Sequence, residues 1–294
     1  MMRAYVGGEI MTNVPKLPAI LYEPLVRAAL AEDLGRAGDI TTDAIVPVSH
    51  RLSATIGARQ DGAIAGLDIA IMAFRLLDPD IRVDVHLPDA SRVKPGDAIA
   101  TISGPARGIL SGERVALNFL GHLSGVATAT AGIADAIRDY KARITCTRKT
   151  MPGMRALQKY AVRCGGGANH RFGLDDAVLI KDNHVAVAGG VAQAIHRARA
   201  NVGHLVKIEV EVDTLAQLEE ALAARAEAVL LDNMSLEQLR QAVAMTDGRA
   251  VLEASGRITP ESAPPIAATG VDLLSAGWLT HSSRVLDVGL DHVG

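Results

Sequence analysis

From about residue 144 onward the chain repeats one unit, in which a short apolar stretch with a polar end is followed by an amphipathic helical pattern. Three of the apolar stretches begin about 22 residues apart, the length of one strand, one helix and two short loops. The predicted strands are Ile144–Thr147, Ala177–Ile180, Val206–Val212, Ala228–Leu231, Ala250–Glu253 and Val271–Ser275. Because no hairpin signals separate these units, the pattern predicts a parallel sheet covered by helices.

Helices are predicted between the later strands, at Thr214–Arg225, Ser235–Met245 and Pro260–Ala268, with Thr214 and Ser235 as N-caps. Polar residues end every predicted strand, whereas an open doubly wound sheet gathers them at one switch point. This distribution favours an α/β barrel, although only six of its strands are clear from the sequence.

The preceding part of the chain mixes short strands and helices, which predicts a small α+β domain. Its predicted elements are helices at Tyr22–Asp33 and Leu67–Leu77 and strands at Ser53–Arg59, Ile81–His86 and Ala98–Ser103. An uncharged run at 115–134 follows, and its Asn, His, Ser and Thr residues make it too polar for a membrane span. We expect a buried helix there, with Gly121, Gly125 and Ala129 on one face that lets another backbone approach closely.

The length of 294 residues suggests two domains, and the composition argues against several kinds of partner. Lys and Arg number 30 and Asp and Glu number 33, so the formal net charge of −3 gives no sign of a nucleic-acid or membrane-surface partner. Two cysteines without metal-ligand spacing predict neither a disulfide framework nor a zinc site, and they favour a reducing, cytoplasmic location. Residues 1–16 lack the apolar core of a signal peptide and are interpreted as a flexible leader.

The ends of the predicted strands carry polar residues from which a site can be built. They are, in chain order, Thr147-Arg-Lys-Thr150, Lys181 to His184, Glu209 to Asp213, Asp232-Asn233, Glu253 to Gly256 and Ser275 to Gly277. The carboxyl ends of barrel strands converge on one mouth, so we expect these residues together. In the stretch 205–212, Lys207, Glu209 and Glu211 share one face and are expected to point into the barrel, where buried charges need partners or a ligand.

A local concentration of cations in this slightly acidic chain predicts an anion site. The segment Arg163–Arg171 joins three consecutive glycines, whose N–H groups can face an anion, to the side chains of His170 and Arg171. With the arginine and lysines at the first two strand ends, this set suits a ligand that carries several carboxylates or phosphates.

Other strand ends carry residues that suit the sugar, metal and phosphate parts of a ligand. Glu211 and Asp232 are fitted to bind sugar hydroxyls or a hydrated Mg²⁺ that bridges phosphate oxygens. Ser255, Gly256 and Gly277 suit a phosphate group held by backbone amides and a hydroxyl. The sequence therefore places a cationic half and a carboxylate half at the same expected mouth.

Ordered motifs run through nearly the whole chain from about Leu17 to the C-terminus. They are Glu32-Asp-Leu-Gly with Gly38-Asp-Ile-Thr-Thr, Glu113-Arg-Val-Ala-Leu-Asn, His122-Leu-Ser-Gly, Thr147-Arg-Lys-Thr with Pro152-Gly153, Arg163 to Arg171, Leu179-Ile-Lys-Asp-Asn-His, Ile208-Glu-Val-Glu-Val-Asp, Leu231-Asp-Asn, Leu252-Glu-Ala-Ser-Gly and Leu279-Thr-His-Ser. In this order and coverage the chain resembles the quinolinate phosphoribosyltransferase family.

The resemblance implies a fold, a reaction and an assembly. The fold is of the α/β class, with an N-terminal α/β sandwich domain and an irregular, open, TIM-like α/β barrel of fewer than eight regular strands. The reaction converts quinolinate and phosphoribosyl pyrophosphate to nicotinate mononucleotide, CO₂ and pyrophosphate in de novo NAD biosynthesis, with Mg²⁺ as cofactor, and the assembly is a homodimer. We expect a leader at 1–16, the sandwich at 17–115, the barrel at 116–280 and a C-terminal tail at 281–294.

The resemblance also implies roles for individual residues. Catalytic roles go to Lys149, Glu211 and Asp232, of which the two carboxylates also hold Mg²⁺, largely through substrate and water. Arg114 is expected to reach into the active site of the partner subunit. The other substrate contacts are Arg148, His170, Arg171 and Lys181 for quinolinate, and Ser255, Gly256, Gly277 and His281 around the 5′-phosphate. Arg257 stands where the family pattern has a second glycine.

Two other functions remain open at this point. A related phosphoribosyltransferase that acts on another base would keep Glu211, Asp232 and Ser255 but alter the group that contains Arg148 and Arg171. A non-catalytic anion-binding protein would need the cations without the pair of carboxylates.

Overall fold

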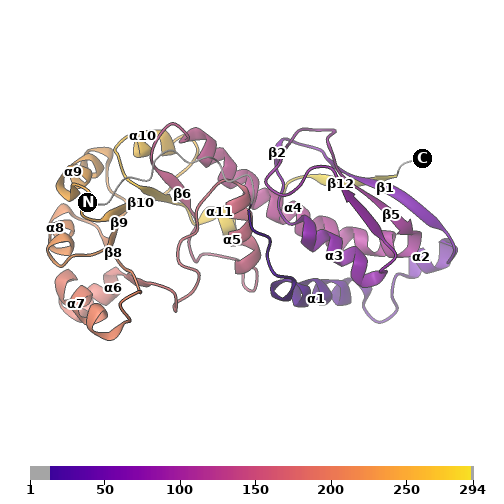
Figure 1. The fold of residues 1–294 in the computed structure, drawn as a ribbon, viewed down its shortest axis with the longest axis horizontal. Coiled ribbons are helices and arrows are strands. Elements are labelled where there is room, and N and C mark those ends of the chain that lie inside the picture. The colour runs from indigo at the N-terminus through magenta and orange to yellow at the C-terminus, as the bar shows by residue number, and fades with distance from the viewer. Residues whose placement is uncertain (1–13, 293–294) are drawn as a thin grey trace. The chain divides into compact units, whose positions relative to one another are not determined.

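The computed structural model describes residues 14–292 (Figure 1), so most of the predicted leader at 1–16 lies outside the described residues. The chain forms two compact units. Among the described residues, one unit comprises 14–129, 156–166 and 282–292, and the other comprises 130–155 and 167–281. Over the described residues, no helix is both long and apolar enough to cross a membrane.

The first unit is built on a four-stranded antiparallel sheet in the order β12-β1-β5-β3. Its strands are β1 (Arg51–Ala58), β3 (Arg82–Val85), β5 (Ala98–Pro105) and β12 (Val288–His292), with a separate two-stranded ladder of β2 (Gly62–Ala63) and β4 (Arg92–Val93). The helices are η1 (Ala19–Leu21), α1 (Glu23–Leu34), α2 (Ile40–Ile45), α3 (Leu67–Leu77), α4 (Ala106–Ala136) and α5 (Arg155–Cys164). Helix α4 continues into the second unit, as its last residues belong there.

The segment interpreted as a C-terminal tail is part of the first unit, which differs from the predicted boundaries. Strand β12 pairs with β1 over Ala54 to Ala58, so it completes the edge of the antiparallel sheet. The chain just before β12 lies against the small residues of α4. A Cβ atom added at Gly121 would lie 3.0 Å from the carbonyl oxygen of Leu286. A Cβ atom added at Gly125 would overlap the carbonyl oxygen of Arg284. The predicted close approach to this helix face is therefore confirmed, and its partner is the C-terminal segment.

Gly125→Ala is expected to lower the free energy of unfolding by about 1–3 kcal/mol, because the added methyl group overlaps backbone atoms that cannot move aside cheaply. Gly132→Ala provides the matched control on the same helix. The nearest atom to a Cβ there is Cγ of Pro260 at 3.8 Å, so the change should raise helix stability by up to about 1 kcal/mol. Urea unfolding monitored by circular dichroism distinguishes the two outcomes, and equal effects of both substitutions would contradict the proposed overlap.

The second unit contains the predicted parallel sheet, with all six strands present in the order β6-β11-β10-β9-β8-β7. The strands are β6 (Arg143–Thr145), β7 (Val178–Ile180), β8 (Ile208–Val212), β9 (Ala228–Asp232), β10 (Val251–Ser255) and β11 (Leu273–Ser275). The helices are α6 (Asp182–Ala188), α7 (Val191–Asn201), α8 (Leu215–Ala223), α9 (Leu236–Thr246), α10 (Ala263–Ala267) and α11 (Trp278–His281). Figure 1 shows α7 to α10 along the outside of β8 to β10.

The strand order leaves this barrel open. Consecutive strands β7 to β11 are neighbours and β6 pairs with β11, so β6 and β7 form the two edges. A single bridge between Thr145 and Ala168 places the start of the 168–177 segment beside β6, at one of these edges. The prediction of an irregular, open barrel with fewer than eight regular strands is confirmed.

Local sequence signals account for the helix starts of this unit. Thr214 and Ser235 cap α8 and α9, and each hydroxyl accepts the N–H of a glutamine three residues later, Gln217 and Gln238. Each glutamine side chain returns a bond to the backbone of its cap residue, which completes a capping box. These boxes fix where the chain leaves β8 and β9, and therefore where the strand-end residues stand.

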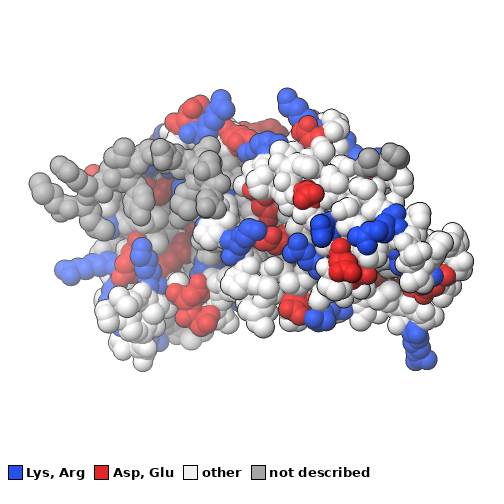
Figure 2. Space-filling view, turned by 45° about the vertical axis from the view of Figure 1, so that its right-hand side comes forward, with Lys and Arg blue, Asp and Glu red and all other residues white. Residues whose placement is uncertain are grey.

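Charged side chains of both signs are intermingled on the face of the molecule drawn in Figure 2, where Lys and Arg lie beside Asp and Glu over the described surface. This mixture accords with the formal net charge of −3.

Candidate active site

The parallel sheet brings the predicted strand-end residues to one edge, because the carboxyl ends of parallel strands lie on the same side. Going along the sheet from β6, this edge carries Arg148 and Lys149 after β6, Gly277 after β11, Ser255 and Gly256 at β10, Asp232 at β9, Glu211 on β8 and Lys181 after β7. The structure thus gathers both the cationic and the carboxylate residues that the sequence predicted for one mouth.

Two arginines form the cationic half of the site. Burial and the nearby positive charge of Arg148 lower the pKa of Arg171. Nη1 of Arg171 donates to the carbonyl oxygen of Ala177 at 2.9 Å. The Nε atoms of both arginines are buried without a hydrogen-bond partner. Because buried donors are normally satisfied, these two point to an anionic ligand between them.

The loop after Arg171 is held in a fixed shape by its own side chains. The carboxylate of Asp176 accepts the N–H groups of Phe172 and Gly173 at 2.6 and 2.9 Å. Arg155 donates Nη1–H to the carbonyl oxygen of Phe172 and Nε–H to the hydroxyl of Thr150. These bonds hold the loop to the strand end that carries Arg148, so the two arginines are presented by connected segments.

Lys149 lies against Gly277. A Cβ at Gly277 would lie 2.8 Å from Cδ of Lys149 and 3.3 Å from Oγ1 of Thr147, so any larger residue would displace the lysine stem. Both polar groups of the Lys149 backbone form hydrogen bonds. Its N–H donates to Thr147 Oγ1, and its carbonyl oxygen accepts from Thr280 Oγ1. Gly277 therefore sets the position of an exposed lysine ammonium at this edge.

Glu211 and Asp232 form the carboxylate half. Burial raises the pKa of Glu211, and the negative charge of Asp232 raises this pKa further. The positive charge of Lys181 acts in the opposite direction and lowers it. Nζ of Lys181 lies 3.8 Å from Glu211 Oε2, and its side chain is half exposed. Half-buried carboxylate oxygens that repel one another are the hard ligands that suit Mg²⁺, and a bound cation would relieve this repulsion. The residues present fit the predicted metal.

The ends of β9 and β10 are locked together around Gly256. The N–H of Asn233 donates to the carbonyl oxygen of Ser255, and Nδ2 of Asn233 donates to Asp232 Oδ2. Gly256 has φ +122°, and a Cβ there would overlap Oδ1 of Asn233. Arg257 has φ +46°, a left-handed conformation that favours glycine and matches the glycine that the family pattern has at this position.

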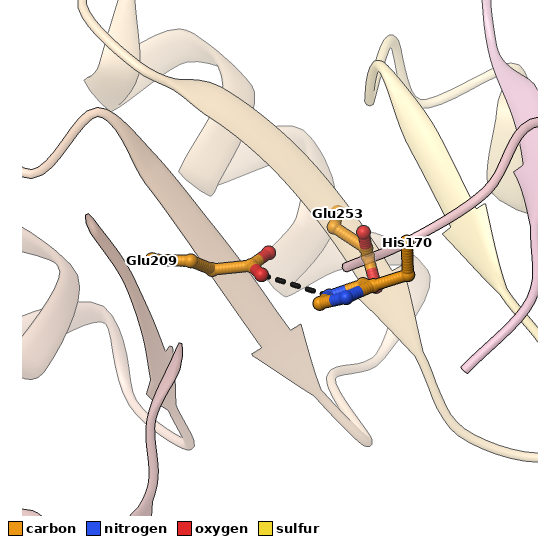
Figure 3. Close-up of side chains that lie close together, drawn as sticks. All are labelled: His170, Glu209 and Glu253. Carbon is orange, nitrogen blue, oxygen red and sulfur yellow. Dashed lines mark ion pairs between the residues drawn. The ribbon is translucent and has the colours of Figure 1, made fainter. Parts of the chain in front are cut away.

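His170 lies among carboxylates inside the barrel (Figure 3). Its Nε2 atom is 2.8 Å from Glu209 Oε2 and 3.7 Å from Glu253 Oε1, and Glu253 is only 2% exposed. Oε1 of Glu253 has no hydrogen-bond partner. Burial, with the nearby Glu209, raises the pKa of Glu253 to about 7, although His170 and Ser275 oppose this shift.

These three side chains offer a ligand set for a divalent cation, with donor atoms within 4.8 Å of one another. However, the hydrogen bond between His170 and Glu209 already occupies the histidine nitrogen, so we assign the cluster to hydrogen bonding. Sequence reasoning placed Glu209 inside the barrel and Glu253 at a strand end without a role for either. The available signal was the acidic residue within an otherwise apolar strand, which in a helix-covered sheet needs an internal partner.

Two expectations from the sequence are wrong. Lys207 does not share the inward face of Glu209 and Glu211, because β8 begins only at Ile208 and Lys207 is exposed. Two of the three consecutive glycines do not offer their amides to an anion: Gly165 and Gly166 donate to the carbonyl groups of Ala161 and Arg163 and thereby end helix α5.

Two further predicted site residues are exposed. Arg114 is an exposed residue of α4 in the first unit, and its expected contact is with a partner subunit. His281 is exposed at the end of α11. Their roles stay predictions.

Comparison with known proteins identifies relatives over most of the chain. The model of the quinolinate phosphoribosyl transferase N-terminal domain matches residues 39–124, and that of the C-terminal domain of the same family matches residues 126–291. The nicotinate-nucleotide pyrophosphorylase (carboxylating) of Mycobacterium leprae is 47% identical over 274 residues, which cover 90% of this chain and 95% of the relative.

Two further relatives extend this similarity. A probable nicotinate-nucleotide pyrophosphorylase (carboxylating) of Bacillus subtilis is 44% identical, with coverage of 88% of this chain and 89% of the relative. The solved structure of the nicotinate-nucleotide pyrophosphorylase from Francisella tularensis matches with a TM-score of 0.91 at 40% identity and covers 96% of this chain and 100% of that one.

Proposed function

Because this chain belongs to the quinolinate phosphoribosyl transferase family, we propose that it converts quinolinate and phosphoribosyl pyrophosphate to nicotinate mononucleotide, CO₂ and pyrophosphate, a step of NAD biosynthesis. The observation that carries the proposal is the pair of arginines Arg148 and Arg171, whose buried Nε donors lack partners. Quinolinate is a planar dicarboxylate, and guanidinium groups bind carboxylates through paired N–H donors.

Charge neutralisation is the first task of the site. Quinolinate carries two negative charges and phosphoribosyl pyrophosphate several more, so the two substrates repel each other at close range. Arg148, Arg171 and Lys181 bind the carboxylates of quinolinate in our proposal. His170 contacts the substrate through its ring carbons, because both of its ring nitrogens already form hydrogen bonds. Lys149 lies between the two substrates, where its ammonium offsets the charge of both.

The carboxylates serve the sugar. Glu211 and Asp232 would hold Mg²⁺, largely through substrate and water, and when bound the ion neutralises charge on the departing pyrophosphate. The same two carboxylates stabilise the positive charge that develops on the ribose ring as the bond from the anomeric carbon to pyrophosphate breaks. Ser255, Gly256, Gly277 and His281 are proposed to bind the 5′-phosphate or lie around it.

The base supplies its own nucleophile. The quinolinate ring nitrogen forms a bond to the anomeric carbon as pyrophosphate leaves with the bonding electron pair. The resulting cationic nitrogen accepts the electrons left when the adjacent carboxylate departs as CO₂, and a proton then replaces it at that ring carbon. No cysteine is needed, and both Cys146 and Cys164 are buried.

We also propose that the protein is a cytoplasmic homodimer in which Arg114 completes the partner's site. The location is supported by the two cysteines, which are both buried and form no disulfide. The role of Arg114 is supported by its exposed position on α4. An arginine from a second subunit would add another donor to the quinolinate pocket.

The first experiment measures nicotinate mononucleotide and pyrophosphate formed from quinolinate, phosphoribosyl pyrophosphate and Mg²⁺, with nicotinate as the control base. We expect turnover with quinolinate alone and loss of turnover when EDTA removes the metal. Turnover only with nicotinate would overturn the assignment of the base pocket. Binding of quinolinate without product would favour a non-catalytic anion-binding protein.

A further inference from the structure

The imidazole ring of His170 makes hydrogen bonds through both nitrogen atoms. Nδ1 accepts the backbone N–H of Arg171 at 2.7 Å, and Nε2 lies 2.8 Å from Glu209 Oε2. A ring nitrogen that accepts an N–H carries no proton, so the proton of the neutral ring is on Nε2 and is donated to Glu209. These two bonds select one tautomer and one orientation of the ring.

Glu209 is the rigid member of this arrangement. It lies in β8, whose backbone pairs with Leu179 of β7 on one side and Ala228 of β9 on the other. The side chains of Glu209 and His170 are only 13% and 11% exposed, so solvent competes little for their bond. His170 itself comes from the irregular 168–177 segment, which pairs with β6 at Ala168 and runs into β7 at Val178.

The ring in turn fixes Arg171. The Arg171 N–H that His170 accepts is adjacent to the Cα that carries the guanidinium side chain, so the direction of that side chain depends on the ring. We propose that Glu209 is a positioning residue for the base-binding half of the site, which acts through His170 to hold Arg171 in the orientation that binds a dicarboxylate substrate. This inference rests on the proposed function.

Glu253, on β10, faces the same ring nitrogen of His170. Its Oε1 atom is 3.7 Å from His170 Nε2 and has no hydrogen-bond partner of its own. Figure 3 shows Glu209 extending toward the ring edge from β8, with Glu253 beside the ring from β10. The contact to Glu209 is the shorter by 0.9 Å, so we assign the orienting role to Glu209.

Three variants of Glu209 test the role of its carboxylate position. Glu209→Gln keeps an oxygen that can accept Nε2–H, whereas Glu209→Ala removes it and Glu209→Asp withdraws the carboxylate by one methylene while keeping the charge. We expect KM for quinolinate to rise about 10–100-fold in Glu209→Ala and Glu209→Asp, with KM for phosphoribosyl pyrophosphate changed less than about 2-fold. Glu209→Gln should stay within about 3-fold of wild type. Glu237→Ala, on exposed α9, is the matched control and should change neither constant.

A second measurement determines the tautomer of the His170 ring directly. Nitrogen-15 NMR of histidine-labelled protein, assigned with His170→Gln, should show a single Nε2–H tautomer in the wild type and in Glu209→Gln, and a tautomer mixture in Glu209→Asp. An unchanged quinolinate KM in folded Glu209→Asp, equal rises in both KM values, or an unchanged tautomer would each overturn the proposal. Absence of turnover in the wild type would instead overturn the proposed function, and the NMR measurement would still decide the role of Glu209.

Discussion

Arg171→Ala is expected to lower the turnover of quinolinate by about 10²–10³-fold, similar to the loss of one preorganised donor at an oxyanion. The guanidinium has a buried Nε without a partner, and its Nη1 is held by the carbonyl oxygen of Ala177, so the group is oriented before any ligand binds. Its neighbour Arg148 cannot replace it, because a planar dicarboxylate needs donors from more than one direction. Steady-state kinetics with quinolinate and phosphoribosyl pyrophosphate measures the effect.

The control for this prediction is Arg240→Ala, which removes an exposed arginine of α9 that pairs only with Glu237 among the ion pairs of the described residues. It should leave turnover within about 2-fold of wild type, since exposed pairs contribute little. A thermal unfolding curve shows whether Arg171→Ala is folded. Near-normal turnover of folded Arg171→Ala would remove the main support for quinolinate as the substrate.

The sequence predicted the parts of the fold that short-range physics determines. The alternation in β8 places Ile208, Val210 and Val212 in the core and leaves Glu209 and Glu211 on the other face. The capping boxes at Thr214 and Ser235 determine where two helices start. These features depend on residues within one turn or one strand of each other, so pattern reasoning identifies them.

Features that depend on distant parts of the chain were not predictable in the same way. Strand β12 pairs with β1, and nothing local to residues 288–292 indicates which strand edge it will join. The glycines before Arg171 were predicted as an anion cradle, but two of them end α5, because the preceding helix offers free carbonyl groups at that point. Local composition alone did not distinguish these two uses of glycine.

The site shows the same division. The residue types at the strand ends indicated an anion site with a carboxylate side, and the parallel sheet brings them to one edge. The interior bonds that orient them were missed, because the contact between His170 and Glu209 joins an irregular segment to a strand that lies far along the chain. The sequence therefore predicted which residues gather at one edge of the sheet better than which bonds hold them in place.

Glu253 is expected to make the protein less stable as the pH rises from about 5 to 8. Burial, together with Glu209, raises the pKa of this carboxyl from 4.5 to about 7 in the folded protein. Between these values the folded protein keeps a proton that the unfolded chain has lost, so the free energy of unfolding decreases with rising pH. The penalty is absent below pH 4.5 and complete above pH 7. Its size is about 3 kcal/mol, from about 1.4 kcal/mol for each pKa unit.

Glu253→Gln isolates this contribution, because the amide has nearly the same shape and does not ionise. The free energy of unfolding of the variant minus that of the wild type should increase by about 2.5 kcal/mol between pH 5 and pH 8, because a small part of the penalty already acts at pH 5. Urea unfolding at both pH values measures this difference. Glu237→Gln on exposed α9 is the control, and its difference should be the same at both pH values. A Glu253→Gln difference that does not change with pH would show that Glu253 ionises alike in the folded and unfolded protein, which would contradict the raised pKa.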